Sequence, residues 1–272
     1  MPEVAADLPP ADQSREGLTA MSFLDHLEEL RRRLIYSIIA VTVGFFACWN
    51  YHEFIFTFVQ RPIMDALRHN GMAEKLVYLN PTEPFNLYLK VAALAGLFVT
   101  SPFVLYQVWM FISPGLYRHE KRYVFPFMFS TVILFLAGGL FAYKMVYPAA
   151  LSFLIDYGKQ FQPMITIGEY TDLFLTIMIG MGVIFELPIL VFFLALMGIV
   201  NAGFMWRNLR YSILVIFIIA AIITPTTDIL NMCIFAAPMV ALYIFSIGIA
   251  WLVHPKQRKA RQARKADDGN QQ

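Results

Sequence analysis

Two acidic residues stand in arginine-rich segments of an otherwise apolar chain. Residues 22–34 read SFLDHLEELRRRL, and residues 113–123 read SPGLYRHEKRY. Glu29 precedes Arg33 by four residues, a spacing that gives a solvated helical ion pair worth about 0.3–0.5 kcal/mol. Glu120 suits the first turn of a helix, where an acid gains about 0.3–1 kcal/mol. Both acids are also expected at the same membrane face, among arginines that can hold each one unpartnered for a ligand, so this second interpretation stays open.

A third acid, Glu186, lies within the apolar stretch MGVIFELPIL at 181–190 and is the only charged residue between Asp172 and Arg207. An acid near the centre of a bilayer costs roughly 2.5 kcal/mol or more, so an acid found there is a candidate functional group. Ionising a lone carboxylate that faces lipid is too costly. We therefore expect Glu186 on the concave side of the bundle, where a partner helix, a water-filled hollow or another span of the chain can reach it.

The residues around Glu186 predict one helix with a local weakness. On a continuous helix the carboxylate shares its face with Gly182, Val183, Ile189 and Leu190. Gly182 leaves a notch one turn before the acid, and Pro188 loosens the backbone hydrogen bonding. The glycines at 138, 139, 180 and 182 are expected to let the third and fourth spans approach their neighbours closely.

The sequence does not support enzymatic chemistry. It lacks the G-x-x-x-x-G-K-[ST] loop that cradles nucleotide phosphates, and His119-Glu120 does not continue into an H-E-x-x-H zinc motif. A G-x-S-x-G nucleophile motif is also missing, and Glu186 has no second membrane acid with which to form a dyad. We therefore expect neither an enzyme nor a bound metal or cofactor. A net charge of only +2 suggests no nucleic-acid partner.

Membrane-spanning helices must position these acids. The chain has 272 residues, of which 58% are hydrophobic and 15% charged, whereas soluble domains have about 25% charged residues. The apolar residues fall in blocks of the roughly 20 residues that cross a bilayer, which predicts an all-α integral membrane protein. The fifth block is shorter than a bilayer, so thinning or neighbouring helices must accommodate it. The six expected spans are at about 34–51, 85–112, 123–147, 172–198, 211–224 and 229–252.

Lysine and arginine residues set the expected orientation. Most of those outside the spans fall on the side that holds both termini, which by the positive-inside rule is the cytoplasm. The outer segments 52–84 and 148–171 carry enough apolar residues to form short helices that cap the opposite face. Three parts are expected: a disordered cytoplasmic tail at 1–21, a membrane domain at 22–254, and a basic, lipid-contacting cytoplasmic tail at 255–272.

The first helix is expected to start at Ser22, which can form a capping box with Asp25. One apolar stripe at helical spacing follows, made of Phe23, Leu27, Leu30 and Leu34. Glu29 lies off this stripe. The pattern predicts an amphipathic helix that lies at the membrane interface and runs into the first span.

Four strings of residues occur in the order known from one protein family. They are HLEELRRRL at 26–34, YQVWMFISPGLYRHEKR at 106–122, FELP at 185–188 and TPTTD at 224–228. Placed between six spans, they resemble TatC, the multispanning core of the twin-arginine protein translocase. The likeness runs from about residue 22 to residue 254. The last string departs from the family's Thr-Pro-Thr-Pro-Asp pattern at its fourth residue.

The resemblance implies a receptor for folded export substrates whose signal peptides carry an Arg-Arg pair. Glu29 and Glu120 are then the acids that contact this pair, and Arg31 and Phe111 are further candidates for the signal-peptide site. Arg31 could instead set the topology, and Phe111 could be interface packing.

Two further positions match ones that matter in relatives, Pro62 at the outer face and Asp228 in the TPTTD string. Pro62 could simply start a helix, and Asp228 could cap the sixth span. Glu186, by contrast, is expected to dock a polar residue of a single-span partner protein, or else to form a hydrogen bond within the chain.

The family also implies an architecture and partners: an open, concave bundle of six helices in the bacterial cytoplasmic (inner) membrane, with transport driven by proton-motive force. The implied partners are TatA- and TatB-type single-span proteins, further TatC copies, the signal peptides and membrane lipids. One alternative is a secondary transporter with Glu186 as its ion or proton site, although such proteins usually show internal repeats and this chain shows none. The other is a structural scaffold, which needs no paired cytoplasmic acids.

Overall fold

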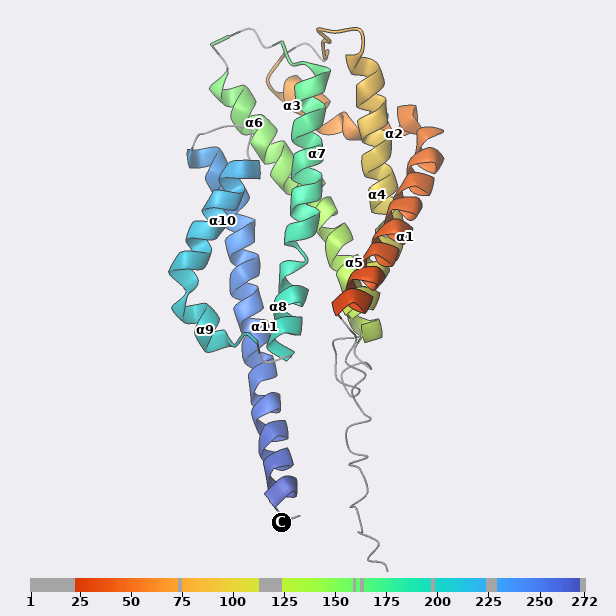
Figure 1. The fold of residues 1–272 in the computed structure, drawn as a ribbon. Helices are drawn as coiled ribbons and strands as arrows, with labels where there is room; N and C mark the ends of the chain where they lie inside the picture. Colours follow the sequence, from red (N-terminus) through yellow and green to blue (C-terminus); the bar gives the residue numbers. More distant parts are fainter. Residues whose placement is uncertain are drawn as a thin grey trace, which may run out of the picture.

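The computed structural model describes residues 23–72, 75–112, 124–158, 160–161, 164–196, 199–223 and 229–269. Over these residues the chain forms helices and short connections, with one isolated parallel bridge between Val77 and Thr166. The predicted all-α class is confirmed (Figure 1). In chain order the elements are α1 (Phe23–Trp49), α2 (His52–Val59), α3 (Arg61–His69), α4 (Glu83–Ile112), α5 (Val124–Phe141), the π-helix η4 (Ala142–Val146), α6 (Tyr147–Tyr157), α7 (Ile167–Ile184), α8 (Leu187–Leu196), α9 (Ala202–Arg207), α10 (Leu209–Ile223) and α11 (Ile229–Gly269).

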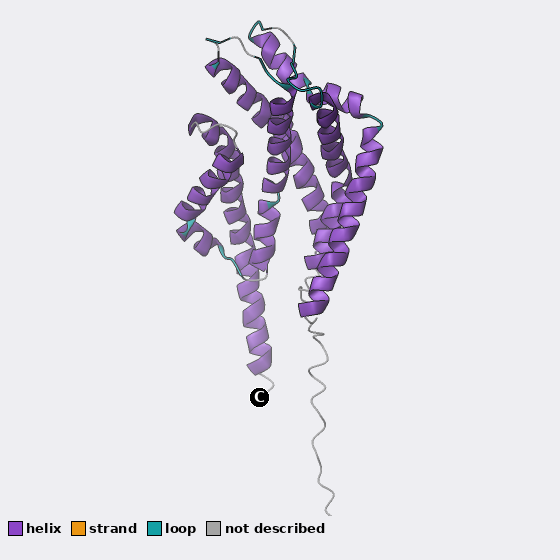
Figure 2. Ribbon diagram, turned by 45° about the horizontal axis from the view of Figure 1, so that its top comes forward, coloured by secondary structure: helices purple, strands orange, loops and turns teal. Residues whose placement is uncertain are grey.

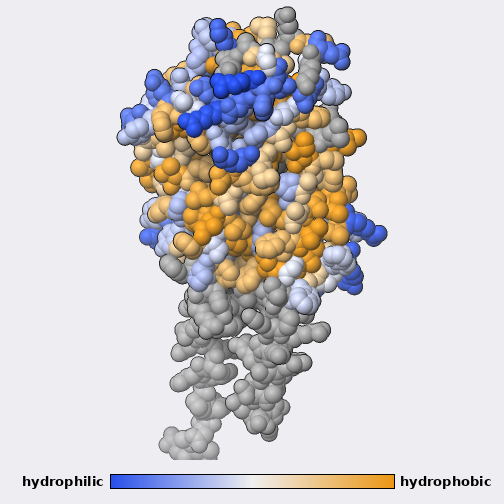
Figure 3. Space-filling view, turned by 180° about the vertical axis from the view of Figure 1, so that it is seen from behind, coloured by the Kyte–Doolittle hydropathy of each residue, from blue (hydrophilic) through white to orange (hydrophobic). Residues whose placement is uncertain are grey.

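Five stretches of the described chain are long and apolar enough to cross a membrane. α10 adds a shorter apolar stretch, Leu209–Ile222, in agreement with the short fifth span predicted from the sequence. On the face shown in Figure 3 a broad hydrophobic belt crosses the middle of the molecule, and hydrophilic residues gather at its upper end. The five long stretches are Leu24–Trp49, Glu83–Ile112, Pro126–Tyr157, Ile167–Ala195 and Met232–Trp251.

The third predicted span, 123–147, is wrong at its outer end. α5 continues without a break through η4 into α6, so the helix extends to Tyr157. Pro148, at the start of α6, has no N–H to donate, which accounts for the widened turn before it. Residues 148–157 therefore prolong a span and do not form a separate cap. The short helices predicted within 52–84 are confirmed as α2 and α3.

The predicted first helix does run into the first span. α1 is one uninterrupted helix from Phe23 to Trp49 (Figure 1), while the position of its first turns at the membrane interface stays a prediction. Leu27, Leu30 and Leu34 of the predicted stripe are 44%, 42% and 56% exposed. These three leucines therefore lie on an outward face of α1.

The helices pack as an open row, as predicted. α1 packs on α4, α4 and α5 pack on α7, and α8 and α10 pack on α11. Only 11% of the α1 span is buried, as expected of a helix at the edge of the row. α1 begins and α11 ends at the same end of the molecule, while α2 and α3 lie near the other end (Figures 1 and 2).

The main core lies toward the end that holds α2 and α3. Tyr147 and Phe174 are fully buried there, with ring centroids 5.1 Å apart in an edge-to-face contact. The Tyr170 hydroxyl donates a hydrogen bond of 2.5 Å to the carbonyl of Val59, which satisfies a buried group at the C-terminus of α2. This end of the row is therefore firmly held together.

Candidate functional site

The end of α1 where the chain enters the membrane domain carries Glu29 and Arg33 on one face of the helix. Arg33 Nη2 lies 3.3 Å from Glu29 Oε1, and the two side chains are 23% and 16% exposed. The predicted i,i+4 pair is thus confirmed. It is half-buried against a neighbouring helix, so solvent screens it less than an exposed pair.

Gln107 of α4 completes this arrangement from the neighbouring helix. Its side chain is buried, at 4% exposure, and its Oε1 accepts a 3.1 Å hydrogen bond from Arg33 Nη1. Arg33 therefore bridges Glu29 and Gln107 and fixes the carboxylate relative to α4. Inspection of the sequence missed Gln107, although a lone amide in an apolar span is itself a signal of a polar contact.

One oxygen of Glu29 is left without a partner. Among the described residues none donates a hydrogen bond to Glu29 Oε2, and this atom is buried; Arg33 Nε is buried and unpartnered in the same way. A buried acceptor without a donor costs about 1–3 kcal/mol, and more when it is charged. The carboxylate is thus poised to accept a donor that comes from outside the described chain.

Phe111 lies one turn beyond Gln107 and stacks on His26. The two ring centroids are 4.4 Å apart and the planes are inclined by 16°. His26 in turn lies one turn before Glu29. The stacked rings therefore pack in the interface between α1 and α4, the α1–α4 seam, beside the carboxylate. The structure therefore brings Phe111 and Glu29 to one site, and Phe111 also serves the interface packing that was its alternative interpretation.

One other predicted site residue, Arg31, does not join Glu29. Arg31 is exposed and lies about 200° around α1 from Glu29, since each residue turns a helix by about 100°. Glu120 follows the end of α4 in sequence but lies outside the described residues. Its contact with the same ligand stays a prediction.

A close approach of two glycines sets the distance between α1 and α4. A Cβ atom on Gly96 would lie 2.6 Å from the backbone nitrogen of Phe45, and one on Gly44 would lie 2.9 Å from the carbonyl oxygen of Gly96. Glycine is required at position 96, because its neighbours there are backbone atoms that cannot rotate away. The same two helices carry Arg33 and Gln107, whose side chains are hydrogen-bonded.

Glu186 does not lie on a continuous helix, contrary to prediction. α7 ends at Ile184, and α8 begins at Leu187. The backbone N–H of Glu186 bonds to Val183 at 3.1 Å in a tightened turn, and Pro188 cannot donate to α7. The expected weakness at Pro188 is thus confirmed, but it is a break in the span and not a loosened turn.

The carboxyl group of Glu186 lacks a partner within the described chain. Its Oε1 is buried and receives no hydrogen bond from the described residues. The notch expected beside it is occupied, because the ring of Phe135 lies where a Cβ on Gly182 would meet it at 2.9 Å. α8 packs through Ile189 and Phe193 on Trp109 of α4, and its other side packs on α11. The position of the carboxylate on the concave side stays a prediction.

The remaining predicted positions are Pro62 and Asp228. Pro62 is buried in the first turn of α3, as expected of a proline that starts a helix, and α3 is at the opposite end of the molecule from Glu29 (Figure 1). Asp228 lies outside the described residues.

Known proteins resemble this chain over most of its length. Residues 25–238 match the sequence profile of the Sec-independent protein translocase protein family, TatC. The TatC protein of Koribacter versatilis (strain Ellin345) is 70% identical over 257 residues, which are 94% of this chain and 95% of that protein. The TatC protein of Carboxydothermus hydrogenoformans is 37% identical over 238 residues, 87% of this chain and 96% of that protein.

Solved structures show the same likeness. A crystal structure of the twin-arginine translocase receptor TatC matches with a TM-score of 0.76 at 34% identity, over 84% of this chain and 99% of that one. A second crystal structure of this receptor, in DDM, matches with a TM-score of 0.75 at 35% identity, over 83% of this chain and 99% of that one.

Proposed function

This chain belongs to the TatC family of Sec-independent protein translocase proteins, and on that premise we propose that it binds twin-arginine signal peptides and forms the core of a translocase for folded proteins. It is a multi-pass membrane protein. As a translocase component it works in a complex and is not an enzyme. The alternative of a secondary transporter is not supported, even though a broken span beside an acid also occurs in such proteins.

One observation carries the proposal for the site: Glu29 Oε2 is buried and unpartnered among the described residues, while Arg33 holds Oε1 in place. A signal-peptide guanidinium can donate to the free oxygen and complete the carboxylate's hydrogen bonds. Such charge-assisted bonds are worth about 1.5–3 kcal/mol each. The planar guanidinium of arginine can offer a carboxylate two parallel N–H donors, a fork that the ammonium group of lysine lacks. This explains why an Arg-Arg pair is the recognised feature.

Arg33 and Gln107 are positioning residues in this proposal. Arg33 neutralises Glu29 in the half-buried seam, and its bond to the buried Gln107 fixes its own side chain. Glu120, on the segment that follows α4, is the second acid of the site and takes the second arginine. Phe111 supplies an apolar wall beside the carboxylate.

The proposed setting is the bacterial cytoplasmic (inner) membrane, with both termini and the Glu29 site in the cytoplasm. The excess of basic residues on that side supports this orientation. TatA- and TatB-type single-span proteins, further copies of this chain and lipids are the proposed partners, and proton-motive force is the proposed energy source. Asp228 joins Glu186 as a candidate for contact with partners, Arg31 remains a further signal-peptide candidate, and Pro62 supports the outer face.

Export of a reporter tests this function. A strain that lacks its own TatC protein but keeps its single-span components should regain export of a folded reporter with an Arg-Arg signal when it carries this chain. The same reporter with a Lys-Lys signal should be exported at least about tenfold less, because lysine lacks the fork. Equal export of both reporters, or of neither, contradicts the proposal.

Replacement of Glu186 separates partner docking from signal-peptide binding. Hydrogen bonds between membrane helices average about 0.6 kcal/mol and rarely exceed about 2 kcal/mol. Glu186→Ala should therefore weaken crosslinking to a single-span partner by about 3- to 30-fold, and Glu186→Gln should keep most transport. Signal-peptide crosslinking should survive both changes.

Val183→Ala is the matched control for Glu186→Ala, because Val183 is an exposed apolar neighbour whose truncation removes no polar group. It should leave partner crosslinking unchanged. If Glu186→Ala instead prevents the protein from accumulating in the membrane, the carboxyl group is structural and docking is the wrong explanation.

A further inference from the structure

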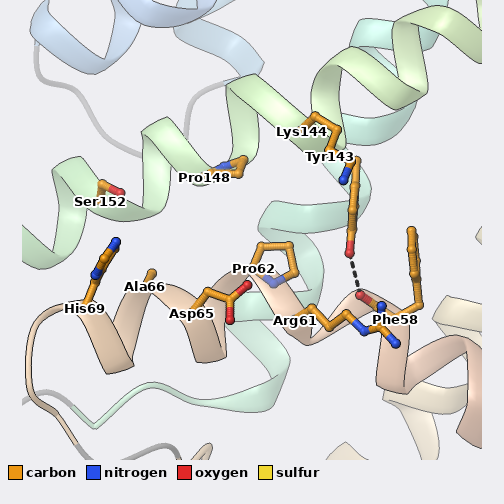
Figure 4. Close-up of a pocket in the computed structure, with 10 residues that line it drawn as sticks. All are labelled: Phe58, Arg61, Pro62, Asp65, Ala66, His69, Tyr143, Lys144, Pro148 and Ser152. Atoms are coloured by element: carbon orange, nitrogen blue, oxygen red, sulfur yellow. Dashed lines mark hydrogen bonds between the residues drawn. The ribbon is translucent and has the colours of Figure 1, made fainter.

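A cavity of about 400 Å³ lies between α3 and the helix formed by η4 and α6 (Figure 4). α3 is at the end of the molecule opposite the start of α1 (Figure 1). The volume of the cavity falls within the roughly 300–1,000 Å³ of small-molecule sites. Its apolar wall includes Phe58, Pro62 and Pro148, and charged and polar side chains of α3, η4 and α6 line much of the rest. Signal-peptide recognition uses none of these charges.

Two cations stand at this cavity, one from each side. Arg61 comes from α3 and Lys144 from η4, and each charge lies 5.9 Å from an aromatic ring centroid, that of Phe58 and that of Tyr143 respectively. The two rings stack on each other with centroids 4.4 Å apart, and the Tyr143 hydroxyl donates a 2.9 Å hydrogen bond to the Phe58 carbonyl (Figure 4). Both cations thus lie next to one stacked aromatic pair.

One carboxylate among the described residues lines the cavity, and it does not neutralise these cations. Asp65 lies one turn after Arg61 on the same face of α3 and points toward the cavity (Figure 4). Within the part of the chain that the structure describes, Asp65 forms no ion pair with Arg61 or Lys144. The cavity therefore presents two cations and a separate anion, a pattern that complements a zwitterion.

The cavity also lies near the end of the hydrophobic belt. Lys144 belongs to the third span, whereas Arg61 belongs to a short helix at the end of the row. Hydrophilic residues at this end adjoin the hydrophobic belt (Figure 3). Charges at such a boundary meet the headgroups of one membrane leaflet, where long basic side chains hold their charge.

We propose that this cavity binds the headgroup of a zwitterionic phospholipid that carries a phosphate and an ammonium group. Arg61 and Lys144 bind the phosphate, since arginine can grip it with a fork and lysine as a point charge. Asp65 binds the ammonium group. The wall formed by Phe58, Pro62 and Pro148 covers the glycerol and the first carbons of the acyl chains. An anionic lipid without an ammonium group fits less well, because it leaves Asp65 unpaired.

Native mass spectrometry of the purified full chain in detergent measures this preference. The chain is titrated with phosphatidylethanolamine and, separately, with phosphatidylglycerol. We expect the first lipid to be retained about tenfold better, the effect of one charge-assisted bond. Arg61→Gln and Lys144→Gln should each weaken retention of both lipids about tenfold. Lys75→Gln, at an exposed lysine near the same end, should weaken neither.

Asp65→Asn provides the decisive comparison. It should remove the preference by lowering retention of phosphatidylethanolamine to the level of phosphatidylglycerol, whereas a structural defect would weaken both lipids. Glu53→Gln, at an exposed acid of α2, should keep the preference. Equal retention of the two lipids by the unaltered chain, or an unchanged preference in Asp65→Asn, overturns the proposal.

A soluble headgroup distinguishes a lipid site from a site for a free phosphate compound. Glycerophosphoethanolamine or inorganic phosphate at millimolar concentration should not displace the bound lipid, because neither gains from the apolar wall. Displacement by either compound would assign the cavity to a soluble phosphate ligand and overturn the lipid proposal.

Discussion

Alanine at both Glu29 and Glu120 is expected to reduce crosslinking of an Arg-Arg signal peptide to the background level. Each carboxylate offers the guanidinium a charge-assisted bond worth about 1.5–3 kcal/mol, so each single change should weaken binding about 10- to 150-fold. At Glu29 this loss of binding is expected because the buried Oε2 has no donor among the described residues and can accept one from the signal peptide. Crosslinking of a photoreactive signal peptide to membranes that contain each variant measures the effect.

Glu28→Ala is the matched control for this result. Glu28 is the adjacent acid on α1 and is exposed, so its replacement changes the charge of the same helix turn without touching the seam with α4. It should leave crosslinking within about twofold, as expected of a solvated surface group. Undiminished crosslinking in the variant that lacks both Glu29 and Glu120 would remove the signal-peptide site from this end of the molecule.

Gly96→Ala is expected to destabilise the fold by forcing two packed helices apart. The new Cβ would lie 2.6 Å from the backbone nitrogen of Phe45 and 2.8 Å from the carbonyl carbon of Gly44. These are backbone atoms, so α1 and α4 must separate to make room for the methyl group. Overpacking of this kind costs about 1–3 kcal/mol, which corresponds to a Tm lower by about 2–12 °C.

Thermal unfolding of the purified protein in detergent measures this loss, and Gly248→Ala is its control. No atom lies within 4 Å of an ideal Cβ on Gly248 of α11, so the same methyl group should leave Tm unchanged there. Gly96→Ala should also weaken signal-peptide crosslinking, because separation of α1 from α4 breaks the bond between Arg33 and Gln107. An unchanged Tm in Gly96→Ala would show that the helices accommodate the methyl group.

The sequence by itself determined the fold class and most of the spans. A bilayer demands about 20 apolar residues per crossing, and this is a property of local composition that a window along the chain detects. The second span was predicted at 85–112 and is α4, Glu83–Ile112. The shortness of the fifth was predicted and is seen in Leu209–Ile222. The order of four strings likewise led to the family.

Errors in the predicted elements arose where one proline changed the backbone. Pro148 widens a turn within a helix that continues to Tyr157, and Pro188 ends α7 at Ile184. Both prolines remove the same donor, yet one helix continues and the other breaks. The surroundings of the two prolines also differ: Tyr147 beside Pro148 is buried in the main core, while α8 after Pro188 packs on Trp109 of α4 and on α11.

Only the tertiary structure decided which polar groups meet. Arg33 and Gln107 are 74 residues apart, and Arg61 and Lys144 come from separate elements around one cavity. Such pairs depend on the rotation of each helix and on its distance from the next, which the glycines at 44 and 96 set for α1 and α4. Hydropathy along the chain carries no information about that rotation, because apolar side chains satisfy lipid and a neighbouring helix equally well.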